Sequence, residues 1–330
     1  MYLWTGQNKC YDAQGNQIPC TKSGQDAAYQ TGETWPEPRF THARDGLIED
    51  RLTGLYWSQD ANPGQFPLSW TEALELIKQF NRDKYLGYSD WRLPNRRELR
   101  SLICHQQSKP PLPENHPFKN IFQGWYWTST TAAMYKDYAW YIHLQGARMF
   151  FGRKDQYSLV WPVRGHTVKL PRTGQKQCYD HQGKIMQCLE SGQDAELKIG
   201  LSWPEPRFTL QTDSVHDQLT GLTWLRETDL TREPVTWTQA LQAIQELNQI
   251  EQKDRLWRLP SINELESLVD CSQHSPALPA DHPFNNVQEA YWSSTTSTFE
   301  PSWAWVLYLH KGAVGVGHKP GKHFLVWPVS

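Results

Sequence analysis

A stretch near the middle of the chain mixes aromatic and basic side chains that could recognise a ligand. An Arg side chain presents a planar fork that suits sulfate or carboxylate, and aromatic faces suit sugar rings or apolar side chains. This combination makes an acidic glycan or a protein epitope the candidate ligand. The candidate ligand-binding residues are Tyr135, Tyr141, His143, Gln145, Arg148, Phe150 and Arg153.

A second set of similar side chains follows about 165 residues later and is poorer in Arg. The two sets differ in type at most positions, as surfaces that bind different ligands would. Neutral drift of surface loops is the alternative explanation. The candidate ligand-binding residues of the second set are Phe299, Trp303, Tyr308, His310 and Lys319, with Lys311 and His318 beside them.

Strand alternation separates the core face from the candidate binding face. In residues 139–145, side chains at every second position point to the same side of a sheet. One side holds Trp140, Ile142 and Leu144, which are matched in type by apolar residues at 305, 307 and 309. The other side, with Tyr141, changes type between the two stretches, so we expect it to be exposed.

These stretches belong to a duplication that covers the whole chain. TGQNKCYD at Thr5 returns as TGQKQCYD at Thr173, and WPEPRFT, TGL-W, WRLP, YW-STT and LVWPV also occur twice. The offset between copies starts at 168 residues, drifts to 165 and ends at 166. Each copy is long enough to bury its own core. The sequence therefore predicts two tandem domains, at residues 1–166 and 167–330.

Charge and hydropathy restrict the class of partner. The chain carries 33 basic and 35 acidic side chains, so neither half is basic enough to argue for nucleic acid. The first 168 residues hold 19 basic and 16 acidic side chains, and the rest hold 14 and 19. This asymmetry indicates that the two halves face different partners or each other, which leaves an oligomer open. No apolar run is long enough to span a membrane.

The cysteines predict two disulfides and an oxidising compartment. Cys10 and Cys20 recur as Cys178 and Cys188 at the same spacing, which would close easily. We therefore expect an extracellular, cell-surface or periplasmic protein. No secretory signal is visible at Met1, so a precursor would have carried one that this sequence lacks. The remaining cysteines, at 104 and 271, are either core thiols or a pair, and no CxxC cluster supports zinc.

Two helices and a small antiparallel sheet are expected in each copy. Ser69 with Glu72, and Asn95 with Glu98, fit capping boxes. Thr236 with Gln239, and Ser261 with Glu264, repeat the pattern. Apolar residues then recur at helical spacing, and the segments after residue 125 and after residue 290 alternate like strands. The fold class is therefore α+β.

The ordered motifs resemble the Lcl C-terminal-domain family of bacterial proteins over nearly the whole chain. That family is similar to C-type-lectin-like domains and, more distantly, to formylglycine-generating enzymes and to variable proteins of diversity-generating retroelements. The resemblance implies two tandem C-type-lectin-like domains and a non-enzymatic, adhesin-like binding protein. It also implies that ligands bind at the C-terminal loops of each domain. The Gly-X-Y repeat of a collagen stalk is absent.

Three alternatives stay open beside this interpretation. One is a retroelement-diversified receptor-binding protein, and another is a scaffold whose loops connect copies of the chain. The third is a metal-dependent or oxidase-like enzyme, although residues 105–170 and 272–330 hold no Cys for such an oxidase. A calcium site at Asp45 and Asp50, or at Asp213 and Asp217, lacks EF-hand spacing. We therefore expect no cofactor.

Overall fold

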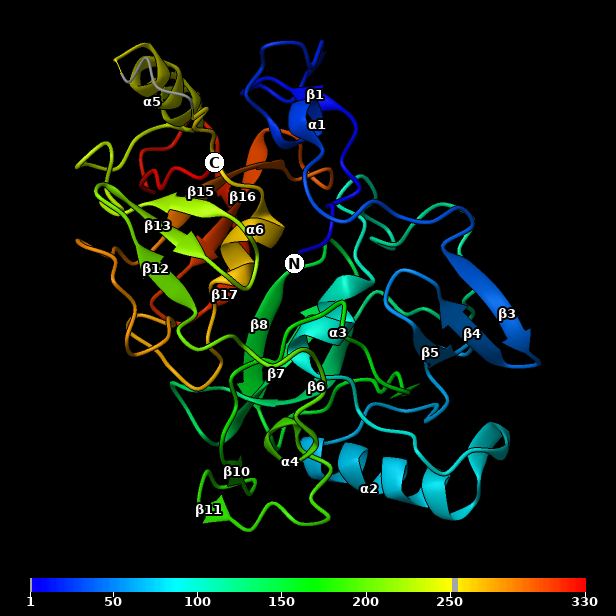
Figure 1. Cartoon of the computed structure of the whole chain (residues 1–330). Coiled ribbons are helices and arrows are strands. Elements are labelled where there is room, and N and C mark those ends of the chain that lie inside the picture. Colours follow the sequence, from blue (N-terminus) through cyan, green and yellow to red (C-terminus); the bar gives the residue numbers. More distant parts are fainter. Residues whose placement is uncertain (1, 251–254) are drawn as a thin grey trace. The chain divides into compact units, whose positions relative to one another are not determined.

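The computed structural model describes residues 2–250 and 255–330 and has an α+β fold with two compact units (Figure 1). Unit 1 comprises residues 1–34, 104–106 and 203–330, and unit 2 comprises residues 35–103 and 107–202. In Figure 1, blue β1 and α1 thus belong with the yellow-green-to-red elements. We call residues 1–34 the first hairpin and residues 167–202 the second hairpin. Each hairpin shares its unit with the body of the other repeat.

Unit 2 contains two antiparallel sheets, two main helices and the second hairpin. One sheet has the strand order β3-β4-β5-β9, and the other contains β6, β7 and β8 with β7 between its neighbours. The strands of the body are β3 (Phe40–Arg44), β4 (Leu47–Asp50), β5 (Leu55–Ser58), β6 (Trp125–Thr131), β7 (Tyr138–His143), β8 (Met149–Arg153) and β9 (Val163–Arg164). The other elements are α2 (Trp70–Arg82), a 3-10 turn (Tyr85–Gly87), α3 (Arg96–Ser101), β10 (Cys178–Tyr179), β11 (Ile185–Met186) and α4 (Asp194–Leu197).

Unit 1 repeats this plan with the first hairpin in place of the second. Its body has a sheet of order β12-β13-β14 and a sheet in which β16 lies between β15 and β17. The hairpin elements are β1 (Cys10–Tyr11), β2 (Gln17–Ile18) and α1 (Asp26–Tyr29). The body elements are β12 (Phe208–Leu210), β13 (Ser214–Asp217), β14 (Thr223–Leu225), α5 (Trp237–Ile250), α6 (Ile262–Ser267), β15 (Tyr291–Thr296), β16 (Trp303–Tyr308) and β17 (Ala313–His318).

The predicted helix starts and disulfides are confirmed. Capping boxes form at Ser69, Asn95 and Ser261, where each cap side chain accepts the backbone N–H three residues later. Thr236 and Gln239 exchange the same pair of hydrogen bonds. The disulfides Cys10–Cys20 and Cys178–Cys188 both form. The four-residue helices α1 and α4 were not expected, because a single turn carries no hydrophobic period.

The second face of the β7 sheet is more buried than the alternation suggested. The first face is core as predicted, since Trp140, Ile142 and Leu144 are all buried. The expectation that the other face is exposed was wrong for most of its length. Helix α2 packs on that face in unit 2, where Tyr141 is half-buried, and α5 does the same in unit 1, where Val306 is fully buried.

Two repeated motifs supply buried ion pairs that fix the bodies. In WRLP, the Arg92 guanidinium donates to both carboxylate oxygens of Glu98, at 2.6 and 2.7 Å. In WPEPRFT, Arg39 donates to both oxygens of Asp50 and lies 4.8 Å from the Trp35 ring centre. The second repeat forms the same pairs, Arg258–Glu264 and Arg207–Asp217. Each pair is desolvated, so loss of one partner leaves an uncompensated charge.

We predict that Glu98→Gln destabilises the protein by about 3 kcal/mol, because Arg92 would stay buried without its counter-ion. Glu72→Gln is the matched control, since Glu72 occupies the same capping-box position in α2 but is exposed. Its replacement should have little effect. Urea unfolding at pH 7 measures both, and equal destabilisation by the two variants would contradict the assignment.

Candidate functional site

The predicted ligand-binding residues of unit 2 separate into two groups on opposite faces of the β6–β8 sheet. On the α2 side, the Trp125 ring lies 4.1 Å from that of Tyr141 and 4.7 Å from that of His143. On the α3 side, Tyr135 contacts Tyr138 and Phe151, at ring distances of 5.3 and 6.0 Å. A single site cannot include both groups, because the sheet lies between them.

Tyr141 fills the core, and its replacement in the second repeat is compensated. Its ring lies against Gly152 and 5.3 Å from Trp127. The equivalent residue in unit 1 is Val306, and there the ring of Phe324 lies against Gly317 and 4.7 Å from Trp292. Phe324 replaces Ser158, which is buried in unit 2. The divergence at residue 141 therefore reflects a repacked core.

We define an aromatic–base edge where the middle strand begins and the third strand ends. In unit 2, Tyr138 on β7 lies opposite Arg153 on β8. In unit 1, Trp303 on β16 lies opposite His318 on β17, with 5.3 Å between their rings. The preceding loop adds Tyr135, which is 50% exposed, or Phe299, which is 38% exposed. The full edge is Tyr135, Tyr138, Phe151 and Arg153 in unit 2, and Phe299, Trp303 and His318 in unit 1.

Tyr138 and Phe151 were not among the ligand-binding residues predicted from the sequence. The prediction also did not distinguish the edge residues from the other candidates. Tyr138 shares the side of the strand that holds Trp140, so alternation alone assigns it to the core. It is only partly buried and stands at the first position of β7. A strand-end position was therefore the signal that could have identified it.

The other predicted residues lie apart from the edge. Arg148 is exposed in the turn between β7 and β8, and Phe150 is the register partner of Tyr141. The imidazole Nδ1 of His143 lies 2.9 Å from the backbone oxygen of Gln145. In unit 1, the Tyr308 ring lies 6.5 Å from His310, at the opposite end of β16 from Trp303.

Lys319 is fully buried and holds the first hairpin. Its ammonium donates to the carbonyls of Tyr11 and Asp12 and lies 4.1 Å from the centre of the Trp237 ring. Lys154 makes the same contacts with Tyr179 and Asp180 of the second hairpin. Burial lowers the pKa of both amines to about 7. The donors of the Lys319 ammonium are therefore used within the chain. Its match to Lys154 in the other repeat is the signal that could have identified Lys319 as scaffold.

A buried carboxylate fixes the other end of each hairpin. Asp26 accepts hydrogen bonds from the hydroxyls of Thr5 and Thr295, at 2.8 and 2.6 Å. Asp194 accepts from Thr173 and Thr130 in the same way. Burial raises the pKa of both carboxyls to about 6, although the hydroxyl donors oppose this shift.

The tip of each hairpin borders the aromatic–base edge. Gly15 has a φ of 90°, and a Cβ there would lie 3.0 Å from the backbone nitrogen of Ser302. Gly183 has a φ of 81°, and a Cβ there would likewise come too close to the backbone of Lys136 and Asp137. Both positions need glycine because the backbone is left-handed and the neighbouring loop is in contact. The loop that carries Tyr135 or Phe299 is thus supported by a hairpin.

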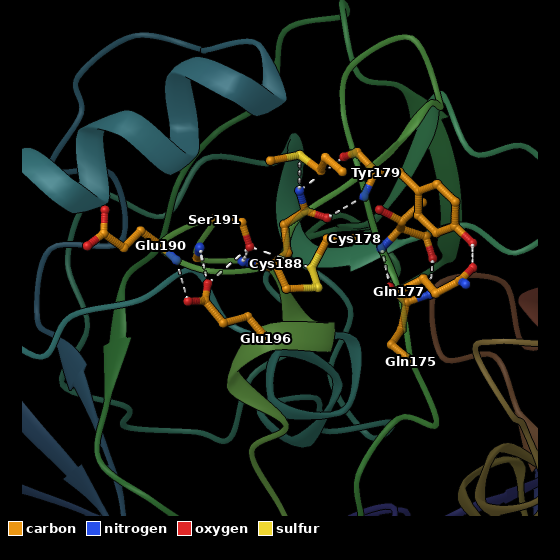
Figure 2. The surroundings of a disulfide bond; sticks show 12 residues. Gln175, Gln177, Cys178, Tyr179, Cys188, Glu190, Ser191 and Glu196 are labelled. Carbon is orange, nitrogen blue, oxygen red and sulfur yellow. Dashed lines mark hydrogen bonds between the residues drawn. A yellow bond between two sulfur atoms is a disulfide. The ribbon is translucent and has the colours of Figure 1, made fainter.

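A disulfide and a carboxylate make the second hairpin rigid (Figure 2). Figure 2 shows Glu196 beside the Cys178–Cys188 bond, where its carboxylate accepts from the backbone of Glu190 and the hydroxyl of Ser191. A groove of about 450 Å³ lies between this hairpin and α2, lined in part by Leu74, Met186 and Leu189. None of the predicted ligand-binding residues lines this groove.

Two of the calcium candidates, Asp50 and Asp217, are engaged in buried ion pairs. Both carboxylate oxygens of Asp50 accept from Arg39, and those of Asp217 accept from Arg207. Within residues 2–250 and 255–330, no cluster of three or more His, Cys, Asp or Glu side chains is placed to hold a metal ion. Cys104 and Cys271 are both buried.

No helix in the described part of the chain has the length and apolar character needed to cross a membrane.

We predict that Tyr141→Val and Ser158→Phe compensate each other. Tyr141→Val alone leaves a cavity beside Trp127, and Ser158→Phe alone overfills the same space, each at a cost of about 1–3 kcal/mol. The double variant reproduces the unit 1 packing. Its loss of unfolding free energy should therefore be smaller than the sum of the losses of the two single variants. Thermal or urea unfolding of all four proteins measures the coupling, and strict additivity would contradict it.

We predict that Asp26→Asn stabilises the protein more at pH 7 than at pH 4.5, by about 1–3 kcal/mol. The folded pKa is raised, so the stabilising contribution of Asp26 is complete below about pH 4 and is lost as the pH rises through about 6. Asn keeps an acceptor for the Thr hydroxyls and carries no charge. Comparison with the parent protein at each pH cancels the titration of Glu264 and Lys319, and Arg258 stays charged throughout.

The control for this experiment is Asp12→Asn. Asp12 is partly exposed, and hydrogen bonds from Asn16 lower its pKa, so its pH dependence should have the opposite sign. Urea unfolding at both pH values measures the two variants. If Asp26→Asn changed the free energy of unfolding equally at both pH values, the Asp26 carboxyl would have the same pKa in the folded and the unfolded chain, which contradicts the prediction.

Comparison with protein families identifies both copies of the repeat. The model of the Lcl C-terminal domain matches residues 46–164 and 213–330, which together make up more than half of the chain. Comparison with curated proteins and with solved structures finds no match. The two matched segments contain the capped helices, the buried pairs Arg92–Glu98 and Arg258–Glu264, and both aromatic–base edges. The chain therefore belongs to the Lcl C-terminal domain family and carries the domain twice in tandem.

Proposed function

We propose that this chain is a non-enzymatic protein of an oxidising, extracellular or periplasmic compartment that binds an anionic ligand at its two aromatic–base edges. The two disulfides are consistent with such a compartment. The C-type-lectin-like character of the fold is part of this proposal, and it would place ligand recognition in the C-terminal part of each domain. Adhesion to a surface that displays the ligand would be the biological use.

The observation that carries the proposal is that the same combination recurs at one register in both units. An aromatic residue on the middle strand faces a basic residue on the third strand, although Tyr138 has become Trp303 and Arg153 has become His318. Nearby, Phe151 and Asp155 become Val316 and Pro320, whereas the adjoining scaffold residue Lys154 recurs as Lys319. Retention of chemical type with a change of residue is expected for two sites that bind related ligands with different preferences.

The chemistry of the edge favours an acidic glycan. The Arg153 side chain is 55% exposed and forms a surface ion pair with Asp155, which contributes little and can be exchanged for a ligand anion. The rings of Tyr135 and Tyr138 offer adjacent faces to a sugar ring. Sulfate or carboxylate on the sugar would pair with the Arg fork. Two such edges on one chain would add avidity for a repeating polymer.

We predict that Arg153→Ala and Tyr138→Ala each weaken binding of the intact chain to sulfated or uronic-acid glycans about tenfold or more, since one charge-assisted hydrogen bond or one stacked ring is lost. Arg82→Ala is the matched control, because Arg82 is also 55% exposed and paired with a carboxylate but lies on α2. A glycan array followed by titration at two salt concentrations measures the effect.

Three results would contradict the proposal. One is the absence of binding to any acidic glycan, and another is equal loss of binding in Arg82→Ala and Arg153→Ala. The third is binding that persists in a variant with both edges removed, Tyr138→Ala with Trp303→Ala. Binding of a protein instead of a glycan by the same edge residues would keep the site and change the ligand class.

A further inference from the structure

The hairpins and the surfaces that receive them are chemically interchangeable. We use the term dock for the residues of a body that hold a hairpin. Each hairpin presents a Gln, an Asp and two backbone carbonyls, and each dock presents two Thr residues and a Lys. The first hairpin and its dock pair Gln7, Tyr11, Asp12 and Asp26 with Thr295, Thr296 and Lys319. The second hairpin and its dock pair Gln175, Tyr179, Asp180 and Asp194 with Thr130, Thr131 and Lys154.

The central contact is an amide that pairs with a strand backbone. The Gln7 side chain donates to the carbonyl of Thr296 at 2.8 Å and accepts from its N–H at 2.9 Å. Gln175 makes both bonds with Thr131, at 3.0 and 3.1 Å. All these groups are buried, so an empty dock would leave a backbone pair and a Lys without partners. Each unit is therefore incomplete until a hairpin occupies its dock.

The two hairpins reach their docks over different lengths of chain. Gln175 and Thr131 are 44 residues apart, so the second hairpin closes a short connection. Gln7 and Thr296 are 289 residues apart, and the whole first body lies between them in sequence. The first hairpin belongs to unit 1 but is continuous in sequence with unit 2, whereas the second hairpin follows directly on the body of its own unit. The first hairpin is therefore the one for which a partner in another chain competes best.

We propose that the dock on residues 203–330 also binds the first hairpin of a second copy of this chain, so that two chains exchange their first hairpins and form a dimer. Exchange keeps every contact of the closed form, and only the effective concentration of the hairpin favours the single chain. The exchanged tip at Gly15 would support the loop of Phe299 in the partner copy. The inference concerns assembly and does not depend on the proposed ligand.

Two full-length variants with complementary defects test the exchange. One carries a defective hairpin, Gln7→Ala with Asp26→Ala, and keeps an intact dock. The other carries a defective dock, Thr295→Val with Lys319→Met, and keeps an intact hairpin. Neither can form a complete hairpin contact alone, but one chain of each can form a complete contact together. Differential tagging and co-purification measure the mixed dimer.

We expect the mixture to yield at least about tenfold more dimer than either variant alone, because each defect removes two or more buried hydrogen bonds. An oxidised peptide of residues 1–34 should dissociate the mixed dimer, and the same peptide with Gln7→Ala should not. A mixture that associates no more than its components would overturn the proposal. So would a mixed dimer that resists the peptide, since the contact would then lie elsewhere.

A second measurement does not rely on the variants. Two tagged forms of the unchanged chain are unfolded in urea with disulfides intact and refolded together at low and high protein concentration. Exchange predicts co-purification that increases with the concentration during refolding and falls when the hairpin peptide is present. Strictly separate chains at every concentration would overturn the proposal even if the variants fail to fold. Circular dichroism before mixing identifies that failure.

Discussion

The structure depends on the burial of a disulfide-closed hairpin against the edge of a β-sheet. Polar contacts between named side chains specify the position of each hairpin. Gln7 and Gln175 pair with the backbone of a strand, while Asp26 and Asp194 gather two hydroxyls each. These groups are desolvated, so each contact is worth more than its equivalent at the surface and an unmade one is costly. The loops of the aromatic–base edges are held in place by the same contacts.

The motifs that occur twice are explained by this requirement and by the buried ion pairs. TGQ supplies the Gln that bonds the dock and a Thr that bonds the Asp of its own hairpin. The Gln of SGQD bonds the backbone of Tyr11 or Tyr179 inside its own hairpin. WPEPRFT and WRLP each supply the Arg of a buried pair. YW-STT supplies the strand that receives the hairpin. Repetition of these motifs therefore records structural contacts, and it carries no direct information about ligands.

Divergence between the repeats has two physical origins that sequence alone does not separate. At residue 141 the change is compensated by a second change in the core, from Ser158 to Phe324. At Tyr138 and Arg153 the residues change while their chemical type persists, and they stand at the ends of their strands. Only the second kind of difference is informative about recognition. The two kinds occur within four residues of one another on the same strand pair.

The sequence by itself determined the local features of this protein: the duplication, the capped helices, the hairpin disulfides, the α+β class and the buried face of the middle strand. These depend on contacts between residues close in the chain or on simple periodicity. The tertiary structure decided that Tyr141 is core, that Lys319 is an anchor, and that each hairpin completes the body of the other repeat. The sequence could not decide the last point, because two like hairpins and two like docks allow either pairing. In the folded protein, the first hairpin occupies the dock of the second repeat and the second hairpin occupies the dock of the first.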